Sequence, residues 1–385
     1  MKIINETQLD FDDVLIKPRR SFLTTRSQVK LERTFYFPHS TKQIECCPIV
    51  CSNMDTTGSF FMADALGFFR SLTCLNKHYS IEECVNFYNG YKFNKELVFL
   101  STGTGEKDIE KLQKIIEEIE KTINKTEQYS KFIPNICVDV ANGYTEKFIR
   151  TLENIRKKYK TPIIMAGNVV TPEMTEELIS HGGVDIVKVG IGSGSVCTTR
   201  LKTGIGRPQL SAVMECSDAA HGIGGHICSD GGCRTAGDVC KAFGAGADFV
   251  MIGSMLAGTN ECDGEWIYEY KCKVKSNDIS SHTEWYQSID PGYPTEKRKK
   301  SLKFYGMSSK EAQDKYNEGL AEYRTSEGRC VNIPYKGTAA SVIKDILGGM
   351  RSCCTYTGAW DIKSLPQKTT FMLVNNTHNR IYEDK

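Results

Sequence analysis

Eight short apolar segments recur along the chain, each followed by small or polar residues and most then by a helical alternation of polar and apolar positions. Apolar runs of this length, separated by helical patterns, are typical of repeated β/α units. The segments span residues 48–54, 71–76, 97–103, 135–141, 162–168, 186–192, 226–232 and 249–254. The pattern therefore predicts eight parallel strands connected by helices.

These segments are apolar at nearly every position, as expected for strands that are covered on both faces. Several end in Gly, Asn or Asp, where a loop from strand to helix would begin. Eight such units favour a closed (β/α)8 TIM barrel of the α/β class over an open doubly wound sheet. The spacing of Ile and Leu over 106–123 predicts an amphipathic helix of the outer ring.

The repeat is interrupted after the eighth segment by a polar stretch at 259–303, which contains Trp266, Trp285 and the charged run 296–300. We interpret this stretch as an inserted excursion. A solvated loop or short β-hairpin is favoured over a separate binding module, because few apolar residues are present to build a core. Helical patterns return at 308–323 and 341–354. Length alone allows one domain or two, and the repeat favours a single barrel domain over 1–385.

The chain has 385 residues, with 49 Lys and Arg against 47 Asp and Glu. This balance gives no general reason to expect nucleic acid or an anionic membrane as partner, so an anionic ligand would need a local site. No apolar stretch is long enough to span a membrane or to act as a signal peptide. The 16 cysteines are spread along the chain without zinc-ligand spacing. We therefore expect a soluble cytoplasmic protein with reduced thiols.

The stretch 187–209 is the most informative about chemistry. It places Gly192, Gly194 and Cys197 on one loop after the sixth predicted strand, at the end of a barrel where active sites are built. Glycines let a backbone approach a ligand closely, and a thiol on such a loop is a candidate nucleophile. The alternative is that Cys197 is one more buried thiol.

Two neighbouring loops have the composition of a phosphate site. Residues 229–232 (SDGG) follow the seventh predicted strand, and Gly253 with Ser254 follows the eighth, the two loops on which barrels often bind phosphate. Ser195 adds a hydroxyl. Tight turns that only need a positive φ would explain either glycine pair alone.

Charged residues also follow other predicted strands. Asp55 follows the first and Asp139 the fourth, where each would either hydrogen-bond a ribose or nicotinamide group or cap the next helix. Lys77 and His78 end the second, and such a pair is more often a surface feature than a catalytic one.

Taken together, the motifs resemble the GMP reductases of the IMP dehydrogenase/GMP reductase family. The resemblance rests on DFDDVLIKPRR (10–20), NMD (53–55), KH (77–78), DVANGY (139–144), GSGSVCTTR (192–200), SDGG (229–232), YGMSS (305–309), AEYRTSEG (321–328) and DILGGMRSCCTYTGA (345–359). It extends almost to the carboxyl end, and only the excursion at 259–303 is longer than the usual connection.

IMP dehydrogenases share the barrel, the cysteine loop and the phosphate loops, so other features must separate the two activities. The short stretch between Lys77-His78 and the third predicted strand leaves no room for the regulatory domain usual in the dehydrogenase. AEYRTSEG and YGMSS resemble the reductase forms, and the Arg-Tyr pair of the dehydrogenase is not found. An IMP dehydrogenase without its regulatory domain and a non-catalytic nucleotide-binding barrel remain the alternatives.

The resemblance implies NADPH-dependent conversion of GMP to IMP and ammonia through a thioimidate on Cys197. It assigns proton transfer to Thr199 with Glu327, a further catalytic role to Lys77, and a mobile flap with the catalytic Glu to 304–330. The implied cofactor positions are Thr25, Arg26, Lys77, Asp139, Val140, Ala141, Met307, Tyr323, Arg324, Ser352 and Thr355. Thr25 and Arg26 would reach the cofactor of a neighbouring subunit in a homotetramer.

The resemblance also implies a nucleotide site and a cation site. The GMP positions are Ser195, Asp230, Gly231, Gly232, Gly253, Ser254, Gly306, Met307, Ser308, Arg324, Thr325, Ser326 and Gly328. Ser254 stands where the family usually has Gly. A potassium ion is expected at Gly192, Gly194, Cys197 and Arg200.

Overall fold

The eight strands predicted from the apolar segments form a closed parallel barrel. This computed structural model describes residues 3–123, 132–273, 283–286, 294–317 and 319–375. The barrel strands are β4 (Ile49–Cys51), β5 (Leu72–Leu75), β6 (Val98–Thr102), β7 (Asn135–Asp139), β8 (Ile164–Val169), β9 (Ile186–Val189), β10 (His226–Asp230) and β11 (Phe249–Ile252). β11 pairs in parallel with β4, with Val250 opposite Ile49, and this pairing closes the barrel. The predicted TIM barrel is confirmed.

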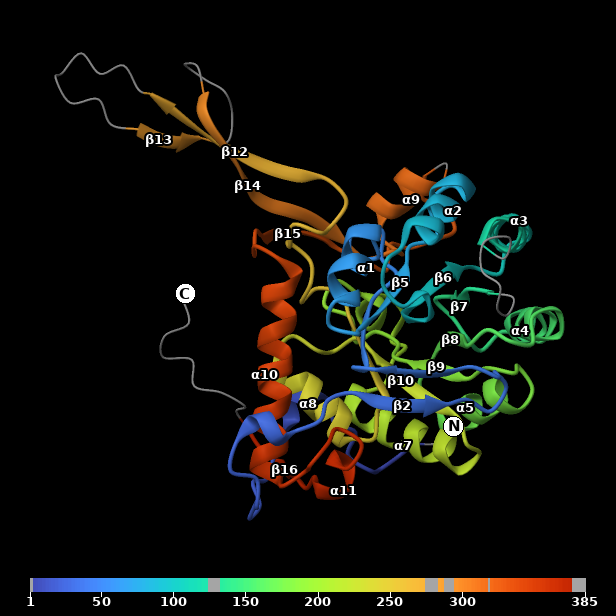
Figure 1. Cartoon of the computed structure of the whole chain (residues 1–385), viewed down its shortest axis with the longest axis vertical. Coiled ribbons are helices and arrows are strands. Elements are labelled where there is room, and N and C mark those ends of the chain that lie inside the picture. Colours follow the sequence, from blue (N-terminus) through green and yellow to red (C-terminus); the bar gives the residue numbers. More distant parts are fainter. Residues whose placement is uncertain (1–2, 124–131, 274–282, 287–293, 318, 376–385) are drawn as a thin grey trace.

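Helices surround the barrel (Figure 1). They are α1 (Phe60–Gly67), α2 (Ile81–Gly90), α3 (Glu106–Ile123), α4 (Glu146–Lys158), α5 (Pro172–Ser180), α6 (Thr199–Thr203), α7 (Gln209–Gly222), α8 (Ala236–Gly244), α10 (Ala339–Thr357) and α11 (Leu365–Lys368). Several begin at a Ser or Thr whose hydroxyl accepts an otherwise unpaired amide, as Ser80 does from Glu83 at 3.1 Å. The predicted amphipathic helix at 106–123 is α3, which buries Leu112, Ile116 and Ile119.

Two apolar layers hold the barrel together. The first lies between the strands and the outer helices and includes Val187 and Val189 of β9. The second fills the barrel interior and includes Ile186 of the same strand, as the period-two alternation of a strand requires. The antiparallel pair β2 (Arg33–Tyr36) and β3 (Gln43–Cys46) contributes Phe35 and Ile44 to this interior layer.

The excursion after the eighth barrel strand contains antiparallel strands. β12 (Trp266–Lys273), β13 (Thr283–Tyr286) and β14 (Pro294–Tyr305) join β15 (Cys330–Pro334) in a four-stranded sheet that projects from one end of the molecule (Figure 1). At its base, Trp266 packs against the main core. The side chain of Trp285 lies outside the described part of the structure.

The helix that completes the eighth β/α unit is α10, which contacts both α8 and α1. Everything from residue 259 to residue 338 is therefore inserted into one strand-to-helix connection. Within it, α9 (Lys310–Tyr316) is shorter than the helix predicted at 308–323. The prediction was wrong at its carboxyl end, because Asn317 is extended and Gly319 has φ +97°, a conformation that ends a helix.

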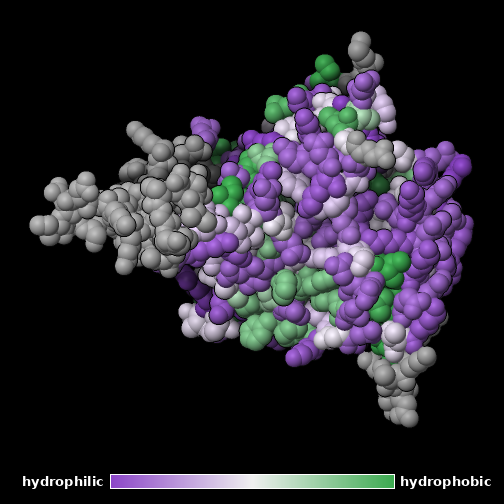
Figure 2. Space-filling model, turned by 90° about the horizontal axis from the view of Figure 1, so that it is seen from above, coloured by the Kyte–Doolittle hydropathy of each residue, from purple (hydrophilic) through white to green (hydrophobic). Residues whose placement is uncertain are grey.

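Two strands from opposite ends of the sequence lie side by side next to α8, where β1 (Val14–Ile16) pairs antiparallel with β16 (Phe371–Leu373). Each cysteine whose side chain is described is a free thiol, as expected. Among the described residues no helix combines the length and apolarity needed to cross a bilayer. On the face that Figure 2 shows, hydrophobic residues form separate patches among hydrophilic ones.

Candidate active site

A chain of three side chains begins at Cys197, on the loop after β9. The Cys197 thiol donates to Thr199 Oγ1 at 3.1 Å, and the Thr199 hydroxyl donates to Glu327 Oε2 at 2.7 Å. All three side chains are partly buried. This geometry forms a route along which a proton can pass between sulfur and carboxylate.

Backbone pairing brings these distant segments together. The amide of Thr198 donates to the carbonyl of Glu327, and the amide of Arg329 to that of Val196, each at 2.9 Å. These two bonds flank Cys197 and Gly328, which face each other as an isolated antiparallel bridge. The position of Glu327 is thus fixed by the main chain on both sides as well as by its own hydrogen bond.

The turn after β14 lies against the same site because two glycines allow close contact. A Cβ atom on Gly328 would lie 2.9 Å from Cβ of Ser309, and one on Gly306 would lie 3.3 Å from Cα of Gly328. The amide of Glu327 donates to the carbonyl of Ser308 at 3.1 Å. The Ser326 hydroxyl accepts the amide of Lys310 at 3.1 Å and donates to the carbonyl of Gly328.

Other predicted nucleotide positions belong to these connected segments. Met307 lies in the turn, and Thr325 precedes Ser326. Ser195 lies beside Cys197, where its carbonyl accepts the Arg329 guanidinium at 2.6 Å. Further along, Arg324 lies 5.9 Å from the ring of Tyr323, which is 86% exposed. The structure therefore brings Gly306, Glu327 and Gly328 next to the cysteine loop, whereas the Tyr323 side chain points to solvent.

The predicted phosphate loops follow the two neighbouring strands β10 and β11. Gly231 and Gly232 have φ of +92° and +84°, so a side chain at either position would be strained. Gly253 is also crowded, because a Cβ atom there would lie 2.8 Å from Ser52 Oγ. Ser254 is partly exposed, and its carbonyl accepts Lys336 Nζ at 2.9 Å. The positive φ angles support the tight-turn interpretation.

A buried lysine lies between two partly exposed carboxylates at the ends of β7, β9 and β10. The Lys188 amine forms an ion pair with Asp139 and lies 3.3 Å from Asp230 Oδ2. Burial disfavours a charge on Lys188, yet the two carboxylates outweigh it and hold the pKa of the amine well above its ordinary value. Lys188 correspondingly lowers the pKa of Asp139 against the effect of burial.

The chain is similar to known proteins over nearly its whole length. The family model described as the IMP dehydrogenase / GMP reductase domain matches residues 8–383. The chain is 48% identical to GMP reductase 2 of Mus musculus over 382 residues, covering 99% of each chain. It is 47% identical to GMP reductase of Escherichia coli O139:H28 over 385 residues, covering 100% of each.

The chain belongs to the IMP dehydrogenase/GMP reductase family. A match over nearly the whole length includes the cysteine loop, the turn after β14 and the segment of Glu327. The sequence-based recognition of this family is confirmed.

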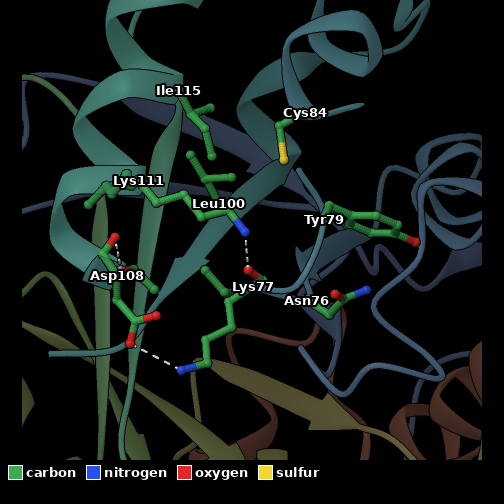
Figure 3. A pocket seen from close by; sticks show the side chains of 11 residues that line it. Asn76, Lys77, Tyr79, Cys84, Leu100, Asp108, Lys111 and Ile115 are labelled. Carbon is green, nitrogen blue, oxygen red and sulfur yellow. Dashed lines mark hydrogen bonds and ion pairs between the residues drawn. The ribbon is translucent and has the colours of Figure 1, made fainter. Parts of the chain in front are cut away.

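In this family member, Lys77 lies at the end of β5, beside α3 (Figure 3). Lys77 Nζ lies 3.1 Å from Asp108 Oδ2, and Lys111 donates to the carbonyl of Lys77 at 2.8 Å. These residues line a small cavity of about 10 Å³, together with Tyr79 and Asn76. The Lys77 side chain is 41% exposed, so its amine remains accessible at this end of the barrel.

Asp55 neither caps a helix nor faces open solvent. It accepts hydrogen bonds from the hydroxyls of Tyr305 and Tyr316, each at 2.6 Å, and from Lys315 Nζ at 3.0 Å. Burial and the hydrogen bond to Asp55 raise the pKa of both tyrosines. This carboxylate therefore fastens α9 to the loop after β4.

His78 stacks on the Tyr316 ring, with ring centroids 3.4 Å apart. Burial, with the nearby charge of Lys77, lowers the pKa of His78 to about 4. His78 is therefore neutral near pH 7, and the stack is a second contact between α9 and the barrel.

The four predicted cation positions lie on the loop that carries Cys197. The carbonyl of Gly194 accepts the Cys197 amide at 3.0 Å, whereas within the described chain no backbone amide is paired with the carbonyls of Gly192 and Cys197. The Arg200 guanidinium donates to Asp10 and to the carbonyl of Arg207, and the Arg200 carbonyl accepts the Gly204 amide at 3.1 Å. Backbone oxygens of this kind suit a monovalent cation. The described residues hold no cluster of three His, Cys, Asp or Glu side chains able to bind a metal.

Four predicted cofactor residues belong to two segments outside this loop. Thr25 and Arg26 are exposed at the start of the short helix η2 (Arg26–Gln28), which contacts α10. Ser352 and Thr355 lie on α10, and the Thr355 hydroxyl donates to the Ser352 carbonyl at 2.7 Å. In Figure 1, α10 runs along the side of the barrel towards β16 and α11. The remaining cofactor positions, Val140 and Ala141, follow Asp139 at the end of β7.

Sequence analysis missed three residues that organise this site. Lys188 lies within a run that the pattern predicts as an apolar strand, and a lysine at that position is itself a visible signal. Asn168 donates to Asp230 at 2.8 Å. Asp10 lies 190 positions before Arg200, and the local sequence gives no signal for its ion pair.

Proposed function

We propose that this chain is a GMP reductase that uses NADPH to convert GMP into IMP and ammonia. The observation that carries the proposal is the contact of Cys197, Thr199 and Glu327, with distances of 3.1 and 2.7 Å. Full-length relatives that bear the name GMP reductase support it. We assign these three residues and Lys77 as catalytic.

In the proposed first step, Cys197 sulfur bonds to C2 of guanine after its proton passes through Thr199 towards Glu327. The same route returns a proton to the amino nitrogen, the C2–N bond breaks and ammonia leaves a thioimidate on the enzyme. The nicotinamide cofactor supplies the hydride that reduces C2. The C2–S bond then breaks, IMP leaves, and the thiolate is restored.

The loops after β10 and β11 would hold the nucleotide. Gly231, Gly232, Gly253 and Ser254 would present backbone groups to its phosphate, and Asp230 would accept a ribose hydroxyl. Ser195, Arg324, Thr325, Ser326, Gly328 and residues 306–308 would contact GMP from the segment 304–330. This segment would act as the flap that closes over the base.

Residues of two neighbouring subunits would contact the cofactor. Lys77, Asp139, Val140, Ala141, Met307, Tyr323 and Arg324 would contact it from one subunit. Thr25 and Arg26 would reach it from a neighbour within a homotetramer, and Ser352 and Thr355 of α10, which η2 contacts, would also contact the cofactor. The Arg26 guanidinium suits the 2′-phosphate that distinguishes NADPH from NADH. Carbonyls of Gly192, Gly194, Cys197 and Arg200 would hold potassium, and the site of action would be the cytoplasm.

A two-substrate assay tests the proposal. The purified chain is given GMP with NADPH, or IMP with NAD, in potassium buffer, and absorbance at the nicotinamide band is followed. We expect a decrease with the first pair and no turnover with the second. The reverse result would establish an IMP dehydrogenase that lacks its regulatory domain. Binding of GMP without turnover in either direction would establish a non-catalytic nucleotide-binding barrel.

A further inference from the structure

The polar layer at the loop end of the barrel interior contains one cation between two carboxylates. Lys188 is 1% exposed, lies on β9, and its amine contacts Asp139 of β7 and Asp230 of β10. Below it, the interior layer is apolar and includes Cys137, Cys228 and Met165. A charged side chain in this place costs free energy unless its partners compensate, so its role is specific.

Two residues of β8 pack against Lys188 and its partner Asp230. A Cβ atom on Gly167 would lie 2.7 Å from Cβ of Lys188 and 2.5 Å from its carbonyl oxygen, so a larger residue on β8 would displace β9. On the other side, Asn168 Nδ2 donates to Asp230 Oδ2 and to the carbonyl of Gly190, each at 2.8 Å. Asp230 is therefore held from two directions, by one amide and one ammonium group.

We infer that Lys188 is a positioning residue that joins the cofactor side of the active site to the nucleotide side by neutralising Asp139 and Asp230 together. The inference rests on the proposed function, which places Asp139 along the cofactor and Asp230 at GMP. Without the amine, the partly exposed carboxylates of Asp139 and Asp230 would face each other with no cation between them, and their charges would repel. Asp230 would then leave the position in which it meets the nucleotide.

This role makes a prediction that general structural damage does not. If Lys188 acts by neutralising Asp139, its loss should weaken GMP binding only while Asp139 is charged. Removing the charge of Asp139 should therefore restore binding in a chain that lacks Lys188. If Lys188 were needed only for packing, the losses of GMP binding caused by removing Lys188 and by removing the Asp139 charge would add.

The test is a double-variant cycle on GMP affinity, measured calorimetrically without cofactor. Every chain carries Cys197→Ala, so that binding stays reversible. The chains compared are this parent, Lys188→Met, Asp139→Asn, and the last two combined. We expect Lys188→Met to weaken GMP binding by at least about tenfold, a loss expected when one member of a buried ion pair is removed. The combined variant should bind GMP within about threefold of Asp139→Asn.

The comparison between the combined variant and Asp139→Asn decides the inference even if Lys188→Met alone is insoluble. A combined variant that binds at least tenfold more weakly than Asp139→Asn, or that does not fold, would overturn it. So would a loss below about threefold for soluble Lys188→Met. If the parent and the wild-type chain both fail to bind GMP, the proposed function itself is wrong.

Discussion

Asp55 shows how one buried carboxylate determines the position of a whole segment. Its side chain is 2% exposed and has three donors on the stretch 305–316. The sequence predicts for it a hydrogen bond to a ribose or nicotinamide group, or a helix cap. Its partners are 250 or more positions away in the chain, and no local pattern reveals such pairings. Cys197, in contrast, was recognisable because its loop position and its flanking glycines are local features.

Asp55→Asn should loosen α9 while leaving the barrel folded. The substitution keeps the size but removes the charge that holds Lys315, and hydrogen bonds to charged groups contribute about 1.5 to 3 kcal/mol. Amide hydrogen exchange within 309–316 should therefore accelerate by roughly ten- to a hundredfold. Glu265→Gln, at the exposed pair with Lys303, is the control and should change little. Unchanged protection in Asp55→Asn would show that α9 is held by other contacts.

His78 should make stability depend on pH. Its folded-state pKa of about 4 lies below the ordinary value of about 6.5. Between these values the unfolded chain binds a proton that the folded chain does not, so stability falls as pH decreases from about 6.5 to 4. His78→Gln should lack this loss of stability. In urea unfolding, the free energy of unfolding of His78→Gln relative to wild type should therefore rise as the pH is lowered through that window. His181→Gln, at a largely exposed histidine, is the control; an equal pH dependence in His78→Gln and wild type would contradict the assignment.

At the scale of elements, strands were easier to predict than the connection that carries Glu327. The eight barrel strands are recognisable in the sequence as apolar runs because each is covered on both faces. The strands of the excursion show no such apolar runs, because β12, β14 and β15 form a small sheet with mixed polarity. The predicted helix at 308–323 continues past the carboxyl end of α9, because helical spacing alone does not reveal that the backbone of Asn317 is extended.

Gly328→Ala should separate the flap segment from the cysteine loop. The added methyl would lie 2.9 Å from Cβ and 3.0 Å from the amide nitrogen of Ser309, so the backbone around Glu327 must move. GMP reduction should fall at least tenfold with the barrel intact, because proton transfer needs close geometry. The control is Gly348→Ala within α10, where a Cβ atom meets nothing within 4 Å; it should stabilise the chain by up to about 1 kcal/mol. Full activity of Gly328→Ala would contradict this account of the site.

The projecting part of the sheet should be dispensable for catalysis. Lys271 pairs with Glu296, so Asn-Gly inserted between them in place of 272–295 would close β12 and β14 as a two-residue hairpin. The shortened chain keeps Trp266 in the core, and its melting temperature and its activity in the two-substrate assay should stay close to wild type. A soluble shortened chain without activity would show that 272–295 contributes to the cofactor site or to assembly.

At the scale of the whole molecule, the barrel explains why residues from distant parts of the sequence meet. The carboxyl ends of β7, β9 and β10 place Asp139, Lys188 and Asp230 in one layer, and the insertion before α10 returns Glu327 to Cys197. The repeat predicted the barrel and thus which loops share one end. It did not predict which side chains touch there, because contacts such as that of Asp10 with Arg200 depend on the packed structure.

The central claim is that Glu327, through Thr199, transfers the proton needed to expel ammonia. Glu327→Gln keeps the size but cannot shuttle a proton, so it should slow deamination alone. General acid–base groups contribute about a hundred- to ten-thousandfold, and steady-state GMP reduction should fall within this range. The reverse half-reaction, in which IMP and NADP give NADPH and the covalent Cys197 intermediate, should proceed at close to the wild-type rate in a single turnover. Cys197→Ala should abolish both. Equal slowing of both half-reactions in Glu327→Gln would contradict the claim, because Glu327 would then position the flap or the base instead of transferring a proton.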